Sequence, residues 1–297
     1  MRSSEWPLIL FTLLIQMSVG FIIALCFFQN SIFAKNGSLM PRETPGKLVL
    51  MVVPLLLIAL LASLFHLGTP RNAWYVLSNV ADSWLSREIL LTIIFSVLVF
   101  SVSVLNYKGI FSPQLRFILL LVCALCGVIL LFTMSRLYML ETVPAWNGFP
   151  TPGAFFLTAL NLGFFFFLTS AIYLSGQSEK NILSAGGINA IYKTLLFIGI
   201  ALLLIELAMW LLHLKFLSAG AAASRESFNT VVSVNAPLFI IRIVLSIAAA
   251  AVMAYTLYSS GRNVFNVNFI YISFVLIIFV ELIGRYLFYA MYARIGV

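Results

Sequence analysis

Eight apolar runs, each about 20 residues long, are the feature of this sequence that most constrains its fold. A helix needs about 20 apolar residues to cross the hydrocarbon core of a bilayer. The runs lie at residues 7–28, 48–67, 88–106, 116–138, 153–174, 191–213, 237–258 and 268–290. We therefore predict an all-α integral membrane protein with eight transmembrane helices, forming a single polytopic membrane domain over residues 1–297.

The composition supports a membrane protein over a soluble one. Hydrophobic residues make up 63% of the sequence and charged residues 9%, whereas soluble domains carry roughly 25% charged residues. So few charges could not cover the surface of a soluble fold. The formal charge of +8 does not indicate a nucleic-acid partner, because the basic residues are scattered among the spans instead of forming one patch.

An even number of spans places both termini on the same side of the membrane. The four loops opposite the termini contain eight basic residues: Lys35, Arg42, Lys47, Lys108, Arg116, Lys180, Lys193 and Arg262. The terminal side contains six, outside the spans: Arg2, Arg71, Arg87, Lys215, Arg225 and Arg294. Because cytoplasmic loops are enriched in Lys and Arg, we predict extracytoplasmic termini in a bacterial cytoplasmic (inner) membrane. The first span is too long an apolar run for a cleaved signal peptide.

The segment at residues 64–89 is unusually polar for this protein, with His66, Arg71, Asp82, Arg87 and Glu88 close together. Gly and Pro just after His66 predict the end of the second helix there. We expect Ser86 to cap the third helix, with Glu88 in its first turn, where the helix dipole favours an anion. Taken singly, such a histidine is most often a solvated end residue and such a glutamate a cap.

Together, His66 and Glu88 are expected at the same depth on adjacent helices, beside three aromatic residues, Trp74, Tyr75 and Trp84. One is a base that titrates near neutrality and the other is a carboxylate. This combination suits an apolar ring with two acidic hydroxyl groups that arrives from within the bilayer. A quinol has that chemistry.

Ionisable groups inside spans are costly and usually face the bundle interior. Glu281 and Arg285 are spaced i, i+4 in the last span, which predicts a structural ion pair on one helix face; a proton or ligand contact is the alternative. Glu206 and Arg242 lie in the sixth and seventh spans, and the sequence leaves open whether they pair.

His66 and His213 each close a span, the second and the sixth. The two histidines thus occupy equivalent positions four spans apart, which favours two four-helix bundles related by a parallel duplication. This placement also permits a different function, a b-type cytochrome with His66 and His213 as axial haem ligands. A secondary transporter is a third possibility, but paired broken spans are not evident, because Pro54 in the second span has no counterpart in the sixth.

The remaining features are interpreted as structural. Cys26, Cys123 and Cys126 all lie in apolar runs, so we expect buried small side chains and no metal site in this protein. An iron–sulfur cluster normally takes four thiolates, so any cluster must belong to a partner. We expect Phe164–Phe167 to face lipid, Gly163 to mark close helix packing, and residues 214–236 to be a plain connection.

Tyr138 ends the fourth span and Trp146 follows it. The sequence leaves two alternatives open for both residues: they are aromatic anchors at the membrane interface, or they contact a ligand. Tyr138 lies just before "ETVPAW" at 141–146 and Trp146 is its last residue; this is one of six short motifs spread in order through nearly the whole sequence. The others are "EWPL" at 5–8, "HLGTP" at 66–70, "LSREI" at 85–89, "TPGAFFLT" at 151–158 and "ELIGRYLFY" at 281–289. Together they resemble the membrane-anchor subunit of dimethyl sulfoxide reductases.

This resemblance implies an eight-helix, haem-free anchor that oxidises menaquinol in anaerobic respiration. Electrons would pass to an iron–sulfur subunit and from there to a molybdopterin catalytic subunit. The family's quinol-site histidine matches His66 and its functional glutamate matches Glu88. Arg71 is one place earlier than the family's arginine, and Asp82 matches no family position. The resemblance leaves the terminal acceptor open among dimethyl sulfoxide, other S- or N-oxides and a selenate-like substrate.

Overall fold

The structure is a computed structural model that describes residues 6–32, 44–66, 75, 77–108, 112–175, 186–261 and 266–295. The regular elements of this part are helical. They are α1 (Trp6–Ile32), α2 (Thr44–Leu50), α3 (Val52–His66), α5 (Trp84–Tyr107), α6 (Pro113–Tyr138), α7 (Pro150–Ser175), α9 (Gly186–Ala219), α10 (Ala222–Asn229), a π-helical turn (Thr230–Val234), α11 (Ala236–Gly261) and α12 (Asn268–Ala290).

Eight helical segments are long and apolar enough to cross a membrane, which confirms the predicted number of spans. They are Trp6–Phe28, Lys47–Phe65, Trp84–Tyr107, Gln114–Tyr138, Pro150–Leu174, Ala190–Ala219, Ala236–Ser260 and Asn268–Ala290. The protein is thus a multi-pass membrane protein.

The sixth span differs from its prediction. α9 continues to Ala219, so His213 does not close the helix. The predicted connection at 214–236 is mostly helical as well, since it contains the end of α9, then α10 and the π-helical turn. Alanine recurs in this segment, and alanine favours helix.

The second span is interrupted between α2 and α3 at Met51. Pro54 follows three residues later and has no N–H to donate to the carbonyl of Leu50, one turn back. The Ser103 hydroxyl on α5 donates to the carbonyl of Val49, 3.1 Å away. A neighbouring helix therefore satisfies one main-chain group at the break, as the low-dielectric interior requires.

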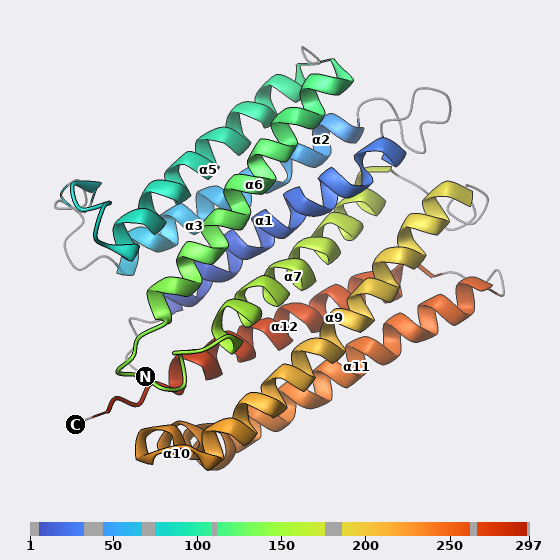
Figure 1. Cartoon of the computed structure of the whole chain (residues 1–297). Helices are drawn as coiled ribbons and strands as arrows, with labels where there is room; N and C mark the ends of the chain where they lie inside the picture. Colours follow the sequence, from blue (N-terminus) through green and yellow to red (C-terminus); the bar gives the residue numbers. More distant parts are fainter. Residues whose placement is uncertain are drawn as a thin grey trace.

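The eight spans form two groups of four with the same packing pattern (Figure 1). In the first group, α1 packs on α3 and α6, and α5 packs on α6. In the second, α7 packs on α9 and α12, and α11 packs on α12. The order of contacts along the sequence repeats, which agrees with the predicted pair of four-helix bundles.

The two groups meet through their first helices, α1 and α7, which make the most extensive helix–helix contact. A Cβ atom on Gly163 would overlap the main chain of Gly20, and one on Gly20 would overlap the carbonyl group of Ala159. The predicted role of Gly163 in close packing is confirmed. The expectation that Phe164–Phe167 faces lipid is wrong, because α7 is enclosed by other helices and three of these four rings are buried.

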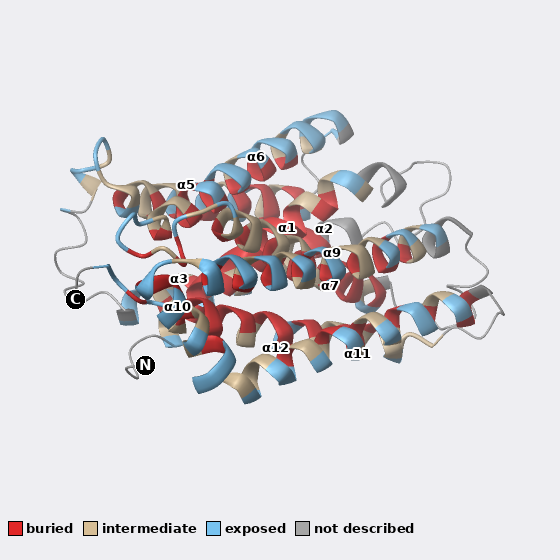
Figure 2. Ribbon diagram, turned by 60° about the horizontal axis from the view of Figure 1, so that its bottom comes forward, coloured by how far each residue is buried: buried red, intermediate tan, exposed pale blue. Residues whose placement is uncertain are grey.

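The outward faces of the bundle are apolar and exposed, whereas the buried residues line its centre (Figure 2). In a bilayer these outer side chains meet lipid. α1, α5, α7 and α11 begin at one end of the bundle, where α3, α6 and α12 end (Figure 1). The described part of the polar segment identified in the sequence, residues 64–66, 75 and 77–89, lies at this terminal end.

Candidate functional site

The described part of α3 ends at His66 and α5 begins at Trp84, so His66 and Glu88 lie near the same end of neighbouring helices. The side chain of His66 lies outside the described residues, as do Arg71 and Trp74. The expected helix start is wrong by one turn. Ser83, not Ser86, caps α5, and its hydroxyl accepts the N–H of Ser86 at 3.3 Å.

This shift moves Glu88 out of the first turn and into the protein. Its side chain is 4% exposed, and no hydrogen bond to its carboxyl group is found within the described residues. A cap residue would be solvated, so the burial removes the simplest structural explanation for Glu88. A buried carboxyl group with no hydrogen-bond partner in the described part of the protein favours a functional role.

The start of α5 is held by two cations. The Arg87 guanidinium donates to the carbonyl of Val80 at 2.9 Å and to that of Ala81. It also lies 4.5 Å from the ring centre of Trp84, and Arg136 of α6 lies 5.4 Å from the same ring. These cation–π contacts fix the half-buried Trp84 at the corner. Tyr75 and Asp82, by contrast, are exposed.

Two tyrosines lie within electrostatic range of Glu88, Tyr138 at the end of α6 and Tyr289 near the end of α12. Their hydroxyl oxygens are 3.0 Å apart, and Tyr289 also hydrogen-bonds to Thr12 of α1. This hydroxyl pair joins the two four-helix groups beside Glu88. Sequence reasoning did not single out Tyr289 or Thr12, since both look like ordinary residues of apolar spans.

An aromatic cluster closes the same end of the bundle. The Trp146 indole donates to the carbonyl of Phe288 at 2.8 Å and stacks on its ring, with centroids 5.4 Å apart. Tyr138 packs edge-on against both rings. Because Tyr138 and Trp146 are buried, neither is an anchor at the membrane interface.

Glu206 and Arg242, whose pairing the sequence left open, form an ion pair with an N–O distance of 2.5 Å. The Arg242 guanidinium also lies 4.5 Å from the ring centre of Trp210 and donates to the carbonyl of Val280 at 3.4 Å. Gly284 leaves the space for it, because a Cβ there would be 2.8 Å from Arg242 Nε.

The predicted ion pair between Glu281 and Arg285 is not formed among the described residues. Glu281 instead accepts hydrogen bonds from Thr158 at 2.7 Å and from Asn161 at 3.1 Å. Arg285 donates to Gln16 at 2.8 Å and lies 4.0 Å from the ring centre of Phe155. Both side chains face the interior, as the i, i+4 spacing predicted, but α1 and α7 supply their partners. In the sequence, these partners could have been found as isolated polar residues within apolar runs, such as Asn161.

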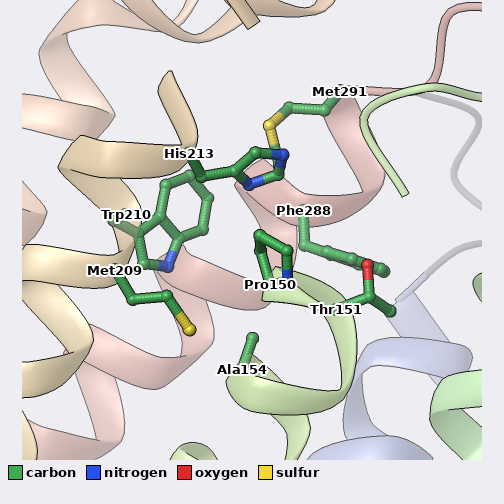
Figure 3. Close-up of a pocket in the computed structure, with 8 residues that line it drawn as sticks. All are labelled: Pro150, Thr151, Ala154, Met209, Trp210, His213, Phe288 and Met291. Carbon is green, nitrogen blue, oxygen red and sulfur yellow. The ribbon is translucent and has the colours of Figure 1, made fainter. Parts of the chain in front are cut away.

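His213 borders a small pocket between α7, α9 and the end of α12 (Figure 3). Its lining residues are Pro150, Thr151, Ala154, Met209, Trp210, His213, Phe288 and Met291. The volume of about 10 Å³ holds about one water molecule, and His213 hydrogen-bonds to the main chain of Ala145. As formed in this structure, the pocket beside His213 has no room for a haem.

The sequence matches a family model and known proteins over most of its length. Residues 1–291 match the family model "DMSO reductase anchor subunit (DmsC)". The sequence is 25% identical over 292 residues to a chain of the anaerobic dimethyl sulfoxide reductase of Haemophilus influenzae, and the alignment spans 98% of this protein and 96% of that one. It is 31% identical over 298 residues to the anaerobic dimethyl sulfoxide reductase chain YnfH of Escherichia coli, with the same coverage.

A third relative matches half of the sequence. The anaerobic dimethyl sulfoxide reductase of Escherichia coli has a chain that is 34% identical over 157 residues, or 52% of this protein and 53% of that one. Because the family model spans nearly all of the sequence and the two longer alignments span 98% of it, the protein belongs to the DMSO reductase anchor subunit family.

Proposed function

We propose that this protein is the membrane anchor of a dimethyl-sulfoxide-reductase-type complex and that it oxidises menaquinol. Electrons pass from the quinol to a partner iron–sulfur subunit and then to a molybdopterin catalytic subunit, in the anaerobic respiration of a bacterial cytoplasmic membrane. The names of the relatives support the assignment to such a complex. The three cysteines of this protein are fewer than one cluster normally needs, so the clusters belong to the partner.

The observation that carries the proposal is the burial of Glu88 at the terminal end of the bundle, on the helix next to the one that bears His66. Oxidation of menaquinol releases two electrons and two protons. His66 accepts a proton from a quinol hydroxyl, because imidazole titrates near neutrality. Glu88 orients the other hydroxyl or accepts its proton.

The other residues predicted from the sequence complete the proposed quinol site. Trp84, fixed by Arg87 and Arg136, supplies a rigid apolar wall for the quinol ring. Arg71, Trp74 and Tyr75 are the other proposed quinol contacts. The quinol reaches the site laterally from the lipid, and the partner subunits bind the extracytoplasmic terminal end, where electrons leave.

Replacing His66 by Ala in membranes that contain the complete complex tests the proposal. We expect quinol-dependent reduction of the terminal acceptor to be abolished, because alanine offers no base for the quinol proton. Reduction driven by a dye that donates directly to the partner subunits is expected to persist. Glu88→Gln is expected to give a milder or pH-shifted loss, because the amide accepts hydrogen bonds but takes no proton.

Two matched controls are available in the same protein. His213→Ala removes the other histidine, and Asp82→Asn removes an exposed acid near α5; both are expected to keep quinol-dependent activity. Full quinol-dependent activity in His66→Ala contradicts the site assignment. Equal loss of quinol-dependent and dye-dependent activity would mean that His66 has a structural role and is not part of the quinol site.

A further inference from the structure

Two carboxyl groups meet in the membrane interior, away from the proposed quinol site. The Asn161 amide nitrogen donates to Glu206 at 2.9 Å and to Glu281 at 3.1 Å. The two carboxyl groups also lie in hydrogen-bonding contact with each other. All three side chains are buried, so no bulk water separates the two acids.

The surroundings of the two acids are unequal. Glu206 has a cation as a direct partner, Arg242, at 2.5 Å. Glu281 has only neutral donors, the hydroxyl of Thr158 at 2.7 Å and the amide of Asn161, among the described residues. The Arg242 cation is therefore in direct contact with only one of the two carboxyl groups.

Arg285 is the other charged group that faces this cluster. Its guanidinium donates to Gln16 of α1 and lies against Phe155 of α7, and it makes no ion pair with Glu281 among the described contacts. The facing groups are thus Gln16 from α1, Thr158 and Asn161 from α7, Arg242 from α11 and Arg285 from α12.

We propose that Glu206 and Glu281 form an internal proton-binding site, in which Glu281 carries a proton and donates it in a hydrogen bond to the ionised carboxylate of Glu206. Two adjacent carboxylates in a low-dielectric interior cannot both ionise without full compensation. A protonated carboxyl group still accepts hydrogen bonds, so the bonds from Thr158 and Asn161 are kept. The ligand of this site is a single proton, and the site is independent of the proposed quinol oxidation.

A matched pair of substitutions tests which of the two acids is protonated and which is ionised. Glu281→Gln replaces a neutral acid by a neutral amide that can still donate to Glu206 and accept from Thr158. We expect the melting temperature of the complex to stay within about 3 °C of the parent. Glu206→Gln leaves the Arg242 cation buried without its counter-ion, and we expect a fall of more than about 8 °C.

Infrared spectroscopy of the purified complex provides a readout that does not depend on activity. At neutral pH we expect the carbonyl band of a protonated carboxylic acid, shifted in D2O, that is lost in Glu281→Gln. The band is expected to remain in Glu226→Gln, which alters an exposed acid on α10. It is also expected to remain in Glu88→Gln, where only a separate band of Glu88 itself would be lost.

Retention of every such band in Glu281→Gln overturns the proposal. So does a loss of stability in Glu281→Gln as large as that in Glu206→Gln, or a failure of the Glu281→Gln protein to fold, because both results mean that Glu281 is ionised. Neither readout depends on quinol turnover, so failure here leaves the proposed function standing.

Discussion

Hydrogen bonds from buried side chains to carbonyl groups of the main chain tie helix ends together near the terminal end of the bundle. The Trp146 indole donates to the carbonyl of Phe288 at 2.8 Å. The Ser227 hydroxyl of α10 donates to the carbonyl of Met291, just after α12, at 2.7 Å. Carbonyls in the last turn of a helix have no intrahelical partner, so these two side chains satisfy groups that the helix itself leaves free.

Replacing Trp146 by Phe is expected to lower stability by about 1 kcal/mol or somewhat more, because the carbonyl of Phe288 loses its buried donor. The measurement is thermal unfolding of the purified complex in detergent. Trp6→Phe is the control, since Trp6 is half exposed and none of the hydrogen bonds described above involves it. An equal effect of the two substitutions would show that ring area, not the hydrogen bond, sets the cost.

At the scale of helices, the crossing of α1 and α7 decides how the two four-helix groups meet. Gly20 and Gly163 face each other so closely that neither position has room for a Cβ atom. Small residues at such a crossing let the two main chains approach and gain van der Waals contact, which drives helix association in lipid.

Gly163→Ala is expected to cost about 3 kcal/mol or more, at the upper end of the range for overpacking, because main chain rather than a flexible side chain blocks the new atom. The yield and melting temperature of the complex measure this effect. Gly148→Ala is the control, since the nearest atom to a Cβ there is Cδ of Pro150, at 3.3 Å. A Gly163→Ala protein as stable as the Gly148→Ala control would contradict the close crossing.

At the scale of the whole molecule, the polar groups gather near one end and in one half. The Tyr138–Tyr289 hydrogen bond joins the two halves near the terminal end, close to Glu88, whereas the Glu206–Arg242 ion pair lies inside the second half. The proposed quinol site and the proposed proton-binding site are therefore separate places in the fold.

The distribution of Lys and Arg predicts that the terminal end is extracytoplasmic. Alkaline phosphatase, which is active only outside the cytoplasm, is expected to be active when fused after the C-terminal residue. Fused within the loop that contains Lys180 it is expected to be inactive. The reverse pattern would place the proposed quinol site and the partner subunits on the cytoplasmic side.

The sequence alone determined the number and approximate position of the spans, because the apolar length needed to cross a bilayer is a local property. It also identified Gly163 as a packing residue and placed His66 and Glu88 at one end of adjacent helices. The start of α5 was wrong by one turn, since both Ser83 and Ser86 suit a cap, and the sequence does not show which of them bonds.

Only the tertiary structure decided what each buried polar group touches. The i, i+4 spacing of Glu281 and Arg285 correctly predicted a shared helix face, but their partners are Thr158, Asn161 and Gln16, on α7 and α1. The burial of Phe164–Phe167 likewise follows from the central place of α7. In an apolar sequence every helix face looks alike to sequence analysis, because lipid and protein interior are equally hydrophobic. Which face meets protein is set by the packing of helices that are distant in the sequence.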